Sequence, residues 1–129
     1  MTTISLTADT FAEHIQKDGI LFIDFWASWC GPCRAFAPVF EAAAQENPDI
    51  VWAKVDTQAE QELAGALEIR SIPTLMIFRD GLLLFSQPGA LPAAALADLV
   101  EQVRSLDMAE IKRQLGEAKT AETASSDSP

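Results

Sequence analysis

Two cysteines separated by two residues are the side chains of this sequence best suited to chemistry. Cys30 and Cys33 are the only cysteines of the 129-residue chain, and they stand in a Trp-Cys-Gly-Pro-Cys motif. An apolar run over Ile20–Trp26 precedes the motif, and a helix-like run begins at Arg34. Two thiols at this spacing, between a strand and a helix, can close into a disulfide and open again. The motif therefore predicts a redox-active pair.

A metal site and a covalently attached haem are the main alternatives for such a pair. Closed zinc and iron–sulfur sites need about four ligands, whereas the chain offers two cysteines and a distant His14. Attachment of haem needs a histidine directly after the second cysteine, and Arg34 stands there. We therefore expect neither a metal nor a cofactor.

The two cysteines are expected to have different roles. A thiol at a helix N-terminus lies beside unpaired backbone N–H groups and the positive end of the helix dipole, which favour the reactive thiolate. Cys30 is therefore predicted to be the nucleophile. Cys33, one turn inside the helix, is predicted to act second by attacking the mixed disulfide. Between them, Pro32 suits a helix start and Gly31 allows close approach of a partner's backbone.

Asp24 is the polar exception in the apolar run before the motif. A carboxylate in the middle of a buried strand costs several kcal/mol unless it is paired, or else its pKa rises and it becomes neutral. The alternative is a solvated position at a strand end, although apolar residues flank Asp24 on both sides.

Strands and helices are predicted to alternate along the chain. In order, we expect a strand near Ser5–Thr7, a helix over Phe11–Lys17, a strand over Ile20–Trp26, a helix over Cys33–Asn47, a strand over Ile50–Val55, a helix over Ala59–Leu67, strands over Thr74–Phe78 and Leu82–Phe85, and a helix over Ala93–Leu106. Asp80-Gly81 predicts a hairpin between the last two strands, and Pro92 suits the first helical position. This order predicts an α/β fold, with a mixed sheet between layers of helices.

These residues together resemble the thioredoxin family over residues 1–106. The resemblance rests on the Trp-Cys-Gly-Pro-Cys motif, on Asp-Phe-Trp-Ala over residues 24–27 and on Ile-Pro-Thr over residues 72–74. It implies a thioredoxin fold, whose mixed sheet of about five strands is flanked by four helices. It also implies reduction of protein disulfides by dithiol–disulfide exchange, with the Cys30–Cys33 disulfide reduced again by a thioredoxin reductase. Gly-Pro between the cysteines is typical of the family's reducing members.

The same resemblance assigns further site residues. Asp24 corresponds to a buried acid that assists proton transfer to and from Cys33. Lys54 corresponds to the partner of this acid, although a lysine on a strand can also extend to solvent. Pro73 corresponds to a cis-proline that faces the disulfide and places the backbone of Ile72 where an extended substrate can pair with it.

A flat apolar contact surface is expected around the disulfide. Its predicted members are Trp29, Gly31, Pro32, Ile72, Pro73, Gly89 and Ala90. Trp29 could instead be merely exposed, but an aromatic side chain next to a nucleophile is typical of a docking surface. Pro88 departs from the family, which usually has a residue with a backbone N–H there, and we expect this change to affect partner choice rather than chemistry.

The C-terminal residues are expected to form an extension, 107–129, after a thioredoxin domain over 1–106. Two apolar stripes, Leu99, Val103 and Leu106, then Met108, Ile111 and Leu115, point about 150° apart on a helical wheel. We therefore predict a break near Ser105–Asp107, where Asp107 can cap a short helix over about 108–118. Glu110 stands at the third position of that helix, and Leu106 and Ile111 are placed as a hydrophobic staple. Disorder is expected beyond Thr120, and a frayed extension throughout is the alternative.

Composition limits the partners. A net charge of −10 without a basic patch argues against nucleic acid and anionic membranes. No apolar run approaches the ~18 residues of a membrane span, and no signal peptide is visible. We expect a cytoplasmic monomer whose partners are thioredoxin reductase and disulfide-containing proteins. A thioredoxin-fold binding module or chaperone-like adaptor that uses the tail is the alternative, and the intact cysteine pair with Asp24 favours the oxidoreductase.

Overall fold

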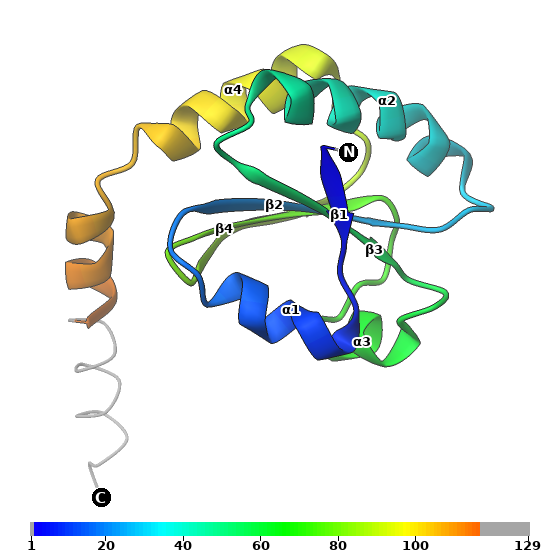
Figure 1. Cartoon of the computed structure of the whole chain (residues 1–129), viewed down its shortest axis with the longest axis horizontal. Coiled ribbons are helices and arrows are strands. Elements are labelled where there is room, and N and C mark those ends of the chain that lie inside the picture. The colour runs from blue at the N-terminus through cyan, green and yellow to red at the C-terminus, as the bar shows by residue number, and fades with distance from the viewer. Residues whose placement is uncertain (1, 117–129) are drawn as a thin grey trace, which may run out of the picture.

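The computed structural model describes residues 2–116, and a five-stranded sheet between two layers of helices organises them (Figure 1). The strands are β1 (Thr3–Ser5), β2 (Ile20–Trp26), β3 (Val51–Asp56), β4 (Thr74–Arg79) and β5 (Leu82–Pro88). The helices are α1 (Ala8–Ile15), α2 (Gly31–Glu46), α3 (Gln61–Ala66) and α4 (Ala93–Arg104), with a further helix over residues 108–116. The sheet order is β1-β3-β2-β4-β5.

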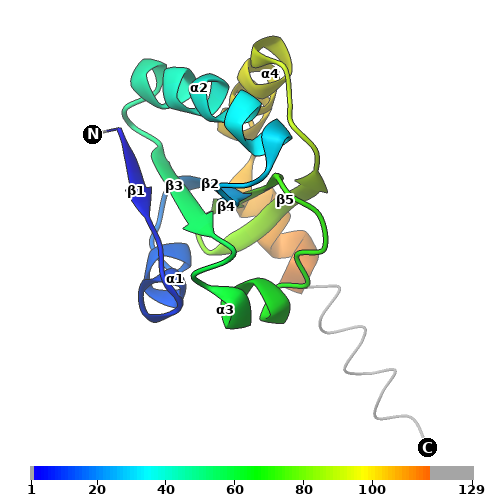
Figure 2. The ribbon, with the colours of Figure 1, turned by 90° about the vertical axis from the view of Figure 1, so that its right-hand side faces the viewer.

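The sheet is mixed, as predicted. Strands β1, β3 and β2 run parallel, while β4 pairs antiparallel with β2 and β5 antiparallel with β4. The central strand β2 has the predicted bounds, and its residues 21–25 are all buried. Figure 2 shows β1 and β5 at opposite edges of the sheet. The fold places the carboxyl end of β2 directly before the cysteine motif.

Alternation along β2 divides the core into two layers. Phe22 packs with Phe36 and Phe40 of α2 and with α4 on one face of the sheet, whereas Ile23 and Phe25 pack on the opposite face with α1. Because side chains of a strand alternate between faces, Asp24 lies on the same face as Phe22. The carboxylate is therefore between the sheet and the helix that carries Cys33.

Several helix starts differ in detail from the sequence prediction, and hydrogen bonds from side chains account for those of α1 and α2. α1 begins at Ala8 rather than Phe11, since Thr7 and Thr10 form a reciprocal capping box. α2 begins at Gly31, and Cys30 is its N-cap, so the helix starts before Cys33. Pro92 is the N-cap of α4 rather than its first helical residue.

Strand β5 is longer than predicted and reaches Pro88, which lies opposite Thr74. The backbone N–H of Gly89 donates to the carbonyl of Pro73 at 2.8 Å. Proline fits this position because β5 is an edge strand, where a missing N–H need not break the ladder. The hairpin therefore continues to the rim of the cysteine motif.

Helix α4 ends at Arg104 and the next helix begins at residue 108, so the helical break lies where the sequence predicts it. The Nη1 atom of Arg79, at the end of β4, donates to the carbonyls of Val103 (2.6 Å), Arg104 (3.3 Å) and Leu106 (3.4 Å). Asp107 then caps the next helix, accepting the backbone N–H of Glu110 at 3.1 Å. The Glu110 carboxylate bonds Arg113 rather than closing a capping box.

The apolar stripes are only partly as predicted. The buried residues of α4 are Leu96, Val100 and Val103, whereas Leu106 lies beyond the helix and is 36% exposed. In the next helix Met108 is buried and Leu115 is 41% exposed. The predicted end of this helix at residue 118 and the predicted disorder after Thr120 lie outside the described residues.

Candidate active site

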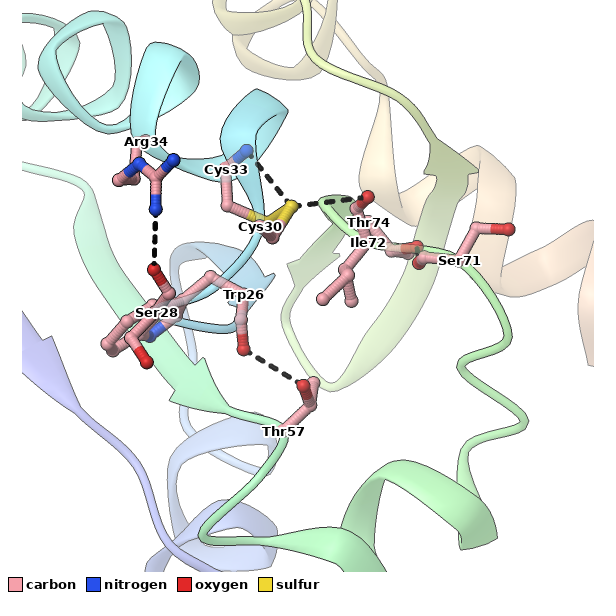
Figure 3. The surroundings of a disulfide bond; sticks show 9 residues. All are labelled: Trp26, Ser28, Cys30, Cys33, Arg34, Thr57, Ser71, Ile72 and Thr74. Carbon is pink, nitrogen blue, oxygen red and sulfur yellow. Dashed lines mark hydrogen bonds between the residues drawn. A yellow bond between two sulfur atoms is a disulfide. The ribbon is translucent and has the colours of Figure 1, made fainter.

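The cysteines lie where β2 leads into α2, and they form a disulfide (Figure 3). Cys30 is the N-cap of α2 with an extended backbone, φ −87° and ψ 114°, and Cys33 lies in the first turn. The backbone N–H of Cys33 donates to Cys30 Sγ at 3.1 Å. Helix N–H groups and the dipole thus favour negative charge on the Cys30 sulfur when the disulfide opens.

Burial does not distinguish the two cysteines. Cys33 is 2% exposed and Cys30 is 5% exposed, so both are inside the surface in the disulfide form. The asymmetry lies in the surroundings instead. Cys30 Sγ accepts the helix N–H and lies 3.7 Å from the carbonyl oxygen of Ile72, across the site.

The loop opposite the disulfide is held on both sides of Ile72. The Ile72–Pro73 peptide bond is cis, as the family resemblance implies. The Thr74 hydroxyl donates to the carbonyl of Ser71, and the Pro73 carbonyl accepts the N–H of Gly89. These bonds fix the carbonyl of Ile72 beside the sulfurs.

All but one of the residues predicted to form the contact surface are exposed or half-buried. Trp29 is 63% exposed, and Gly31, Pro32, Gly89 and Ala90 are exposed as well. Ile72 is half-buried and packs against the cysteine pair. Pro73 is fully buried, so it supports this surface from below rather than forming part of it.

Asp24 is buried without a hydrogen bond. Its exposed fraction is 0%, and neither carboxylate oxygen has a hydrogen-bond partner among the described residues. Burial raises the pKa of Asp24 from 3.8 to about 7, and the positive charge of Lys54 opposes this shift. The carboxyl can therefore gain or lose a proton near neutral pH, and a solvated strand end is excluded.

Lys54 lies on the strand next to Asp24, but its ammonium group contacts an aromatic ring. Lys54 of β3 lies opposite Asp24 of β2. Its Nζ sits over the ring of Trp26, 5.1 Å from the centroid, and no ion pair within 4.0 Å joins it to Asp24 among residues 2–116. Lys54 therefore acts on Asp24 at longer range while a cation–π contact holds it.

Two contacts around the motif were not predicted. The Trp26 ring lies under the Lys54 ammonium group, and the Trp26 carbonyl accepts the Thr57 hydroxyl at 2.9 Å. The Arg34 guanidinium donates to the carbonyl of Ser28 at 3.0 Å (Figure 3). The alternation of β2, which puts Trp26 on the same face as Asp24, could have indicated the first contact.

The chemistry open to this arrangement is dithiol–disulfide exchange. One sulfur caps a helix, and a second lies one turn away. A buried carboxyl with a pKa of about 7 lies on the face of the sheet that α2 covers, and the exposed residues Trp29, Gly31 and Pro32 adjoin the cysteines. These features on a mixed sheet between two helical layers define a thiol–disulfide oxidoreductase.

Comparisons with known proteins identify the family. The chain matches the family profile described as Thioredoxin over residues 2–102. It is 52% identical over 116 residues to "Putative thioredoxin 2" of Streptomyces coelicolor, covering 90% of this chain and 87% of that protein. It is 38% identical over 103 residues to the thioredoxin of Bacillus subtilis, covering 79% of this chain and 98% of that protein.

Solved structures agree with the sequence matches. The structure of Plasmodium falciparum thioredoxin is similar with a TM-score of 0.70 and 30% identity, covering 78% of this chain and 97% of that one. The structure of Malassezia sympodialis thioredoxin gives a TM-score of 0.69 and 30% identity, covering 77% and 89%. The chain belongs to the thioredoxin family and is a protein-disulfide reductase. No helix within residues 2–116 is long and apolar enough to cross a membrane.

Proposed function

We propose that Cys30 is the nucleophile of this reductase and Cys33 the resolving cysteine. The Cys30 thiolate attacks one sulfur of a substrate disulfide, forms a mixed disulfide and releases the other sulfur as a thiolate. Cys33 then loses its proton and attacks Cys30, which closes the Cys30–Cys33 disulfide and releases the second substrate thiolate. Both electrons pass from the protein dithiol to the substrate.

The observation that carries this assignment is the N-cap position of Cys30. Its sulfur accepts a helix N–H and stands 3.7 Å from the Ile72 carbonyl, next to the exposed contact surface. A substrate that adds along the backbone of Ile72 would bring its own disulfide to this sulfur. Trp29, Gly31, Pro32, Gly89 and Ala90 would then contact the substrate.

Asp24 is proposed as the proton acceptor for Cys33, with Lys54 as a positioning residue. A base works best when its pKa lies near the working pH, and the pKa of about 7 meets this condition. Lys54 lowers the pKa of Asp24 and so keeps part of the population ionised. The face of β2 that bears Asp24 is the one covered by α2, where Cys33 lies.

The reaction needs a source of electrons, which we propose is a thioredoxin reductase. A reducing cytoplasm and a monomeric protein fit the lone cysteine pair, because catalytic disulfides in that compartment are transient. A binding module or chaperone-like adaptor is the rival function. It has less support, because such a module does not require a redox disulfide with a titrating acid behind it.

Reduction of insulin disulfides tests the proposal. We expect turnover with NADPH and a thioredoxin reductase, and loss of turnover in Cys30→Ser and in Cys33→Ser. Absence of turnover in the wild-type protein, with both thiols intact, would favour the adaptor. Turnover that persists in Cys30→Ser would refute the nucleophile assignment.

A further inference from the structure

The arginines of the chain fall into two groups by their partners. Three of the five form ion pairs with acidic side chains: Arg79 with Asp80, Arg104 with Asp49, and Arg113 with Glu110. The other two, Arg34 and Arg70, form no ion pair with any residue in the described range 2–116. Both are exposed.

Arg34 stands directly beside the redox centre. It follows Cys33 in α2, and its guanidinium donates to the carbonyl of Ser28 in the loop that carries Trp29. In Figure 3 its side chain lies on one side of the disulfide, and Ile72 lies on the other. A guanidinium held by one carbonyl keeps free N–H groups for a further acceptor.

Arg70 belongs to the segment that leads into Ile72, on the opposite side of the disulfide from Arg34. It precedes Ser71 and Ile72, and the Ile72 carbonyl faces Cys30 Sγ. A hollow of about 150 Å³ lies there. It is lined by Leu67, Glu68, Ile69, Arg70, Ser71, Thr74, Ser86 and Pro88. Glu68 is the only acidic residue among them, so the charges of Arg70 and Glu68 oppose each other at this hollow.

The placement of these two cations matters because the rest of the molecule is acidic. The net charge is −10, so the protein as a whole repels acidic partners. Two arginines without an ion pair, in the two segments that border the disulfide, place positive charge near the redox centre, and Glu68 offsets part of it. An acidic segment would meet these charges in the orientation that brings its disulfide toward Cys30, and such complementarity acts on association rate and specificity.

We propose that Arg34 and Arg70 select substrates whose disulfide is flanked by acidic side chains. This inference rests on the proposed function, because it names the substrate class of that same site. The apolar surface around Trp29 supplies contact area without regard to charge. The two guanidinium groups add preference for carboxylates on each side of the attacked bond.

A matched pair of peptides tests the inference. Each peptide is closed by one disulfide, and Asp and Glu beside the cysteines of the first are replaced by Asn and Gln in the second. The quantity measured is the ratio of the second-order rate constants for reduction of the acidic and the neutral peptide by pre-reduced protein, followed by stopped-flow at low salt. We expect a ratio of about 5 for the wild type, since exposed charge pairs have modest effects.

The variants separate charge from structure. Arg34→Gln and Arg70→Gln should each lower the ratio, the double variant should bring it to about 1, and Arg34→Lys with Arg70→Lys should restore most of it. Glu68→Gln should raise it. Lys112→Gln, which removes an equal charge from the helix over residues 108–116, should leave it unchanged. At about 0.5 M salt the ratio should approach 1, because screening shortens the Debye length below about 10 Å.

Other outcomes overturn the inference. A wild-type ratio of 1 or less, a ratio that persists in the double Gln variant, or an equal fall in Lys112→Gln would refute selection by these arginines while the reductase function stands. Failure to reduce either peptide would refute the proposed function, and the inference with it.

Discussion

Asp24 shows how one buried group links stability to reactivity. Its carboxyl is fully buried on the face of β2 that α2 covers, and burial raises its pKa to about 7. A carboxyl whose folded pKa exceeds its unfolded value holds its proton more tightly in the native state. The native state is therefore penalised once the pH exceeds the unfolded value of 3.8, and the penalty stops growing above about pH 7.

Asp24→Asn should remove this pH dependence and stabilise the protein at high pH. The gain expected above pH 7 is about 4 kcal/mol in the free energy of unfolding, and it should vanish near pH 3, where the acid is protonated in both states. Denaturant unfolding of the disulfide form from pH 3 to 8.5 measures it. Asp98→Asn, at an exposed position on α4, is the control. An Asp24→Asn variant less stable than the wild type at pH 8 would contradict the account.

Lys54 should affect the pH range over which the free energy of unfolding falls. Its charge lowers the pKa of Asp24, so Lys54→Met should raise the pKa further; the loss of stability should still begin above pH 3.8 but continue to higher pH and become larger. Carboxyl NMR titration of Asp24 measures the shift directly, and Lys112→Met is the control for a lost charge. An unchanged or lower pKa in Lys54→Met would show that the ammonium group, held over Trp26, does not act on the carboxyl.

At the scale of elements, the sequence predicted correctly those strand and helix bounds that depend on neighbouring residues alone. The bounds of β2 follow from its apolar run, which Asp24 alone interrupts, because both faces of the strand are buried. Helix starts were displaced where a side chain caps the backbone, as Thr7 does for α1 and Cys30 for α2. For α4, the prediction that Leu106 is a buried helical residue was wrong. Arg79, distant in sequence, binds the carbonyls where α4 ends, before Leu106.

The site divides in the same way. The cysteine pair, the buried acid and the cis-proline could be predicted from short motifs. The cation–π contact between Lys54 and Trp26 depends on the register of β2 against β3, which no motif carries. Whether Arg34 and Arg70 form ion pairs depends on where every acidic side chain lies. Both features follow from the three-dimensional arrangement, not from a short motif.

Arg79→Leu should loosen the junction between α4 and the next helix. The substitution leaves three carbonyls without their donor, and we expect a loss of about 2 kcal/mol in the free energy of unfolding. Amide exchange in the last turn of α4 should accelerate more than exchange in β2. Lys112→Leu removes an exposed cation from the following helix as a control. Equal stability of Arg79→Leu and the wild type would show that these bonds do not hold the junction.

At the scale of the whole molecule, the C-terminal segment lies beyond residue 102, where the match to the thioredoxin family ends. We propose a thioredoxin domain over residues 1–106 and an extension from residue 107. The Streptomyces match covers 90% of this chain, 116 residues, which is longer than that domain, so it includes part of the extension. Met108 is buried, so the segment returns to the body at its start.

A chain ending at residue 106 should fold and reduce insulin at a rate close to that of the full chain. Its stability should fall by about 1 to 2 kcal/mol, because the burial of Met108 is lost. Thermal unfolding and the insulin assay measure the two quantities, and Met108→Ala in the full chain tests the cause separately. A truncated chain that is unfolded or inactive would make the extension part of the catalytic domain.

Trapping of the mixed disulfide tests the central assignment most directly. Reduced Cys33→Ser and Cys30→Ser variants are mixed with a disulfide-containing protein, and the adducts are identified by mass spectrometry under non-reducing conditions. We predict that Cys33→Ser accumulates an adduct linked through Cys30, because the resolving thiol is absent. Cys30→Ser should form little or none. An adduct linked through Cys33 in equal or greater yield would contradict the assignment of Cys30 as the nucleophile.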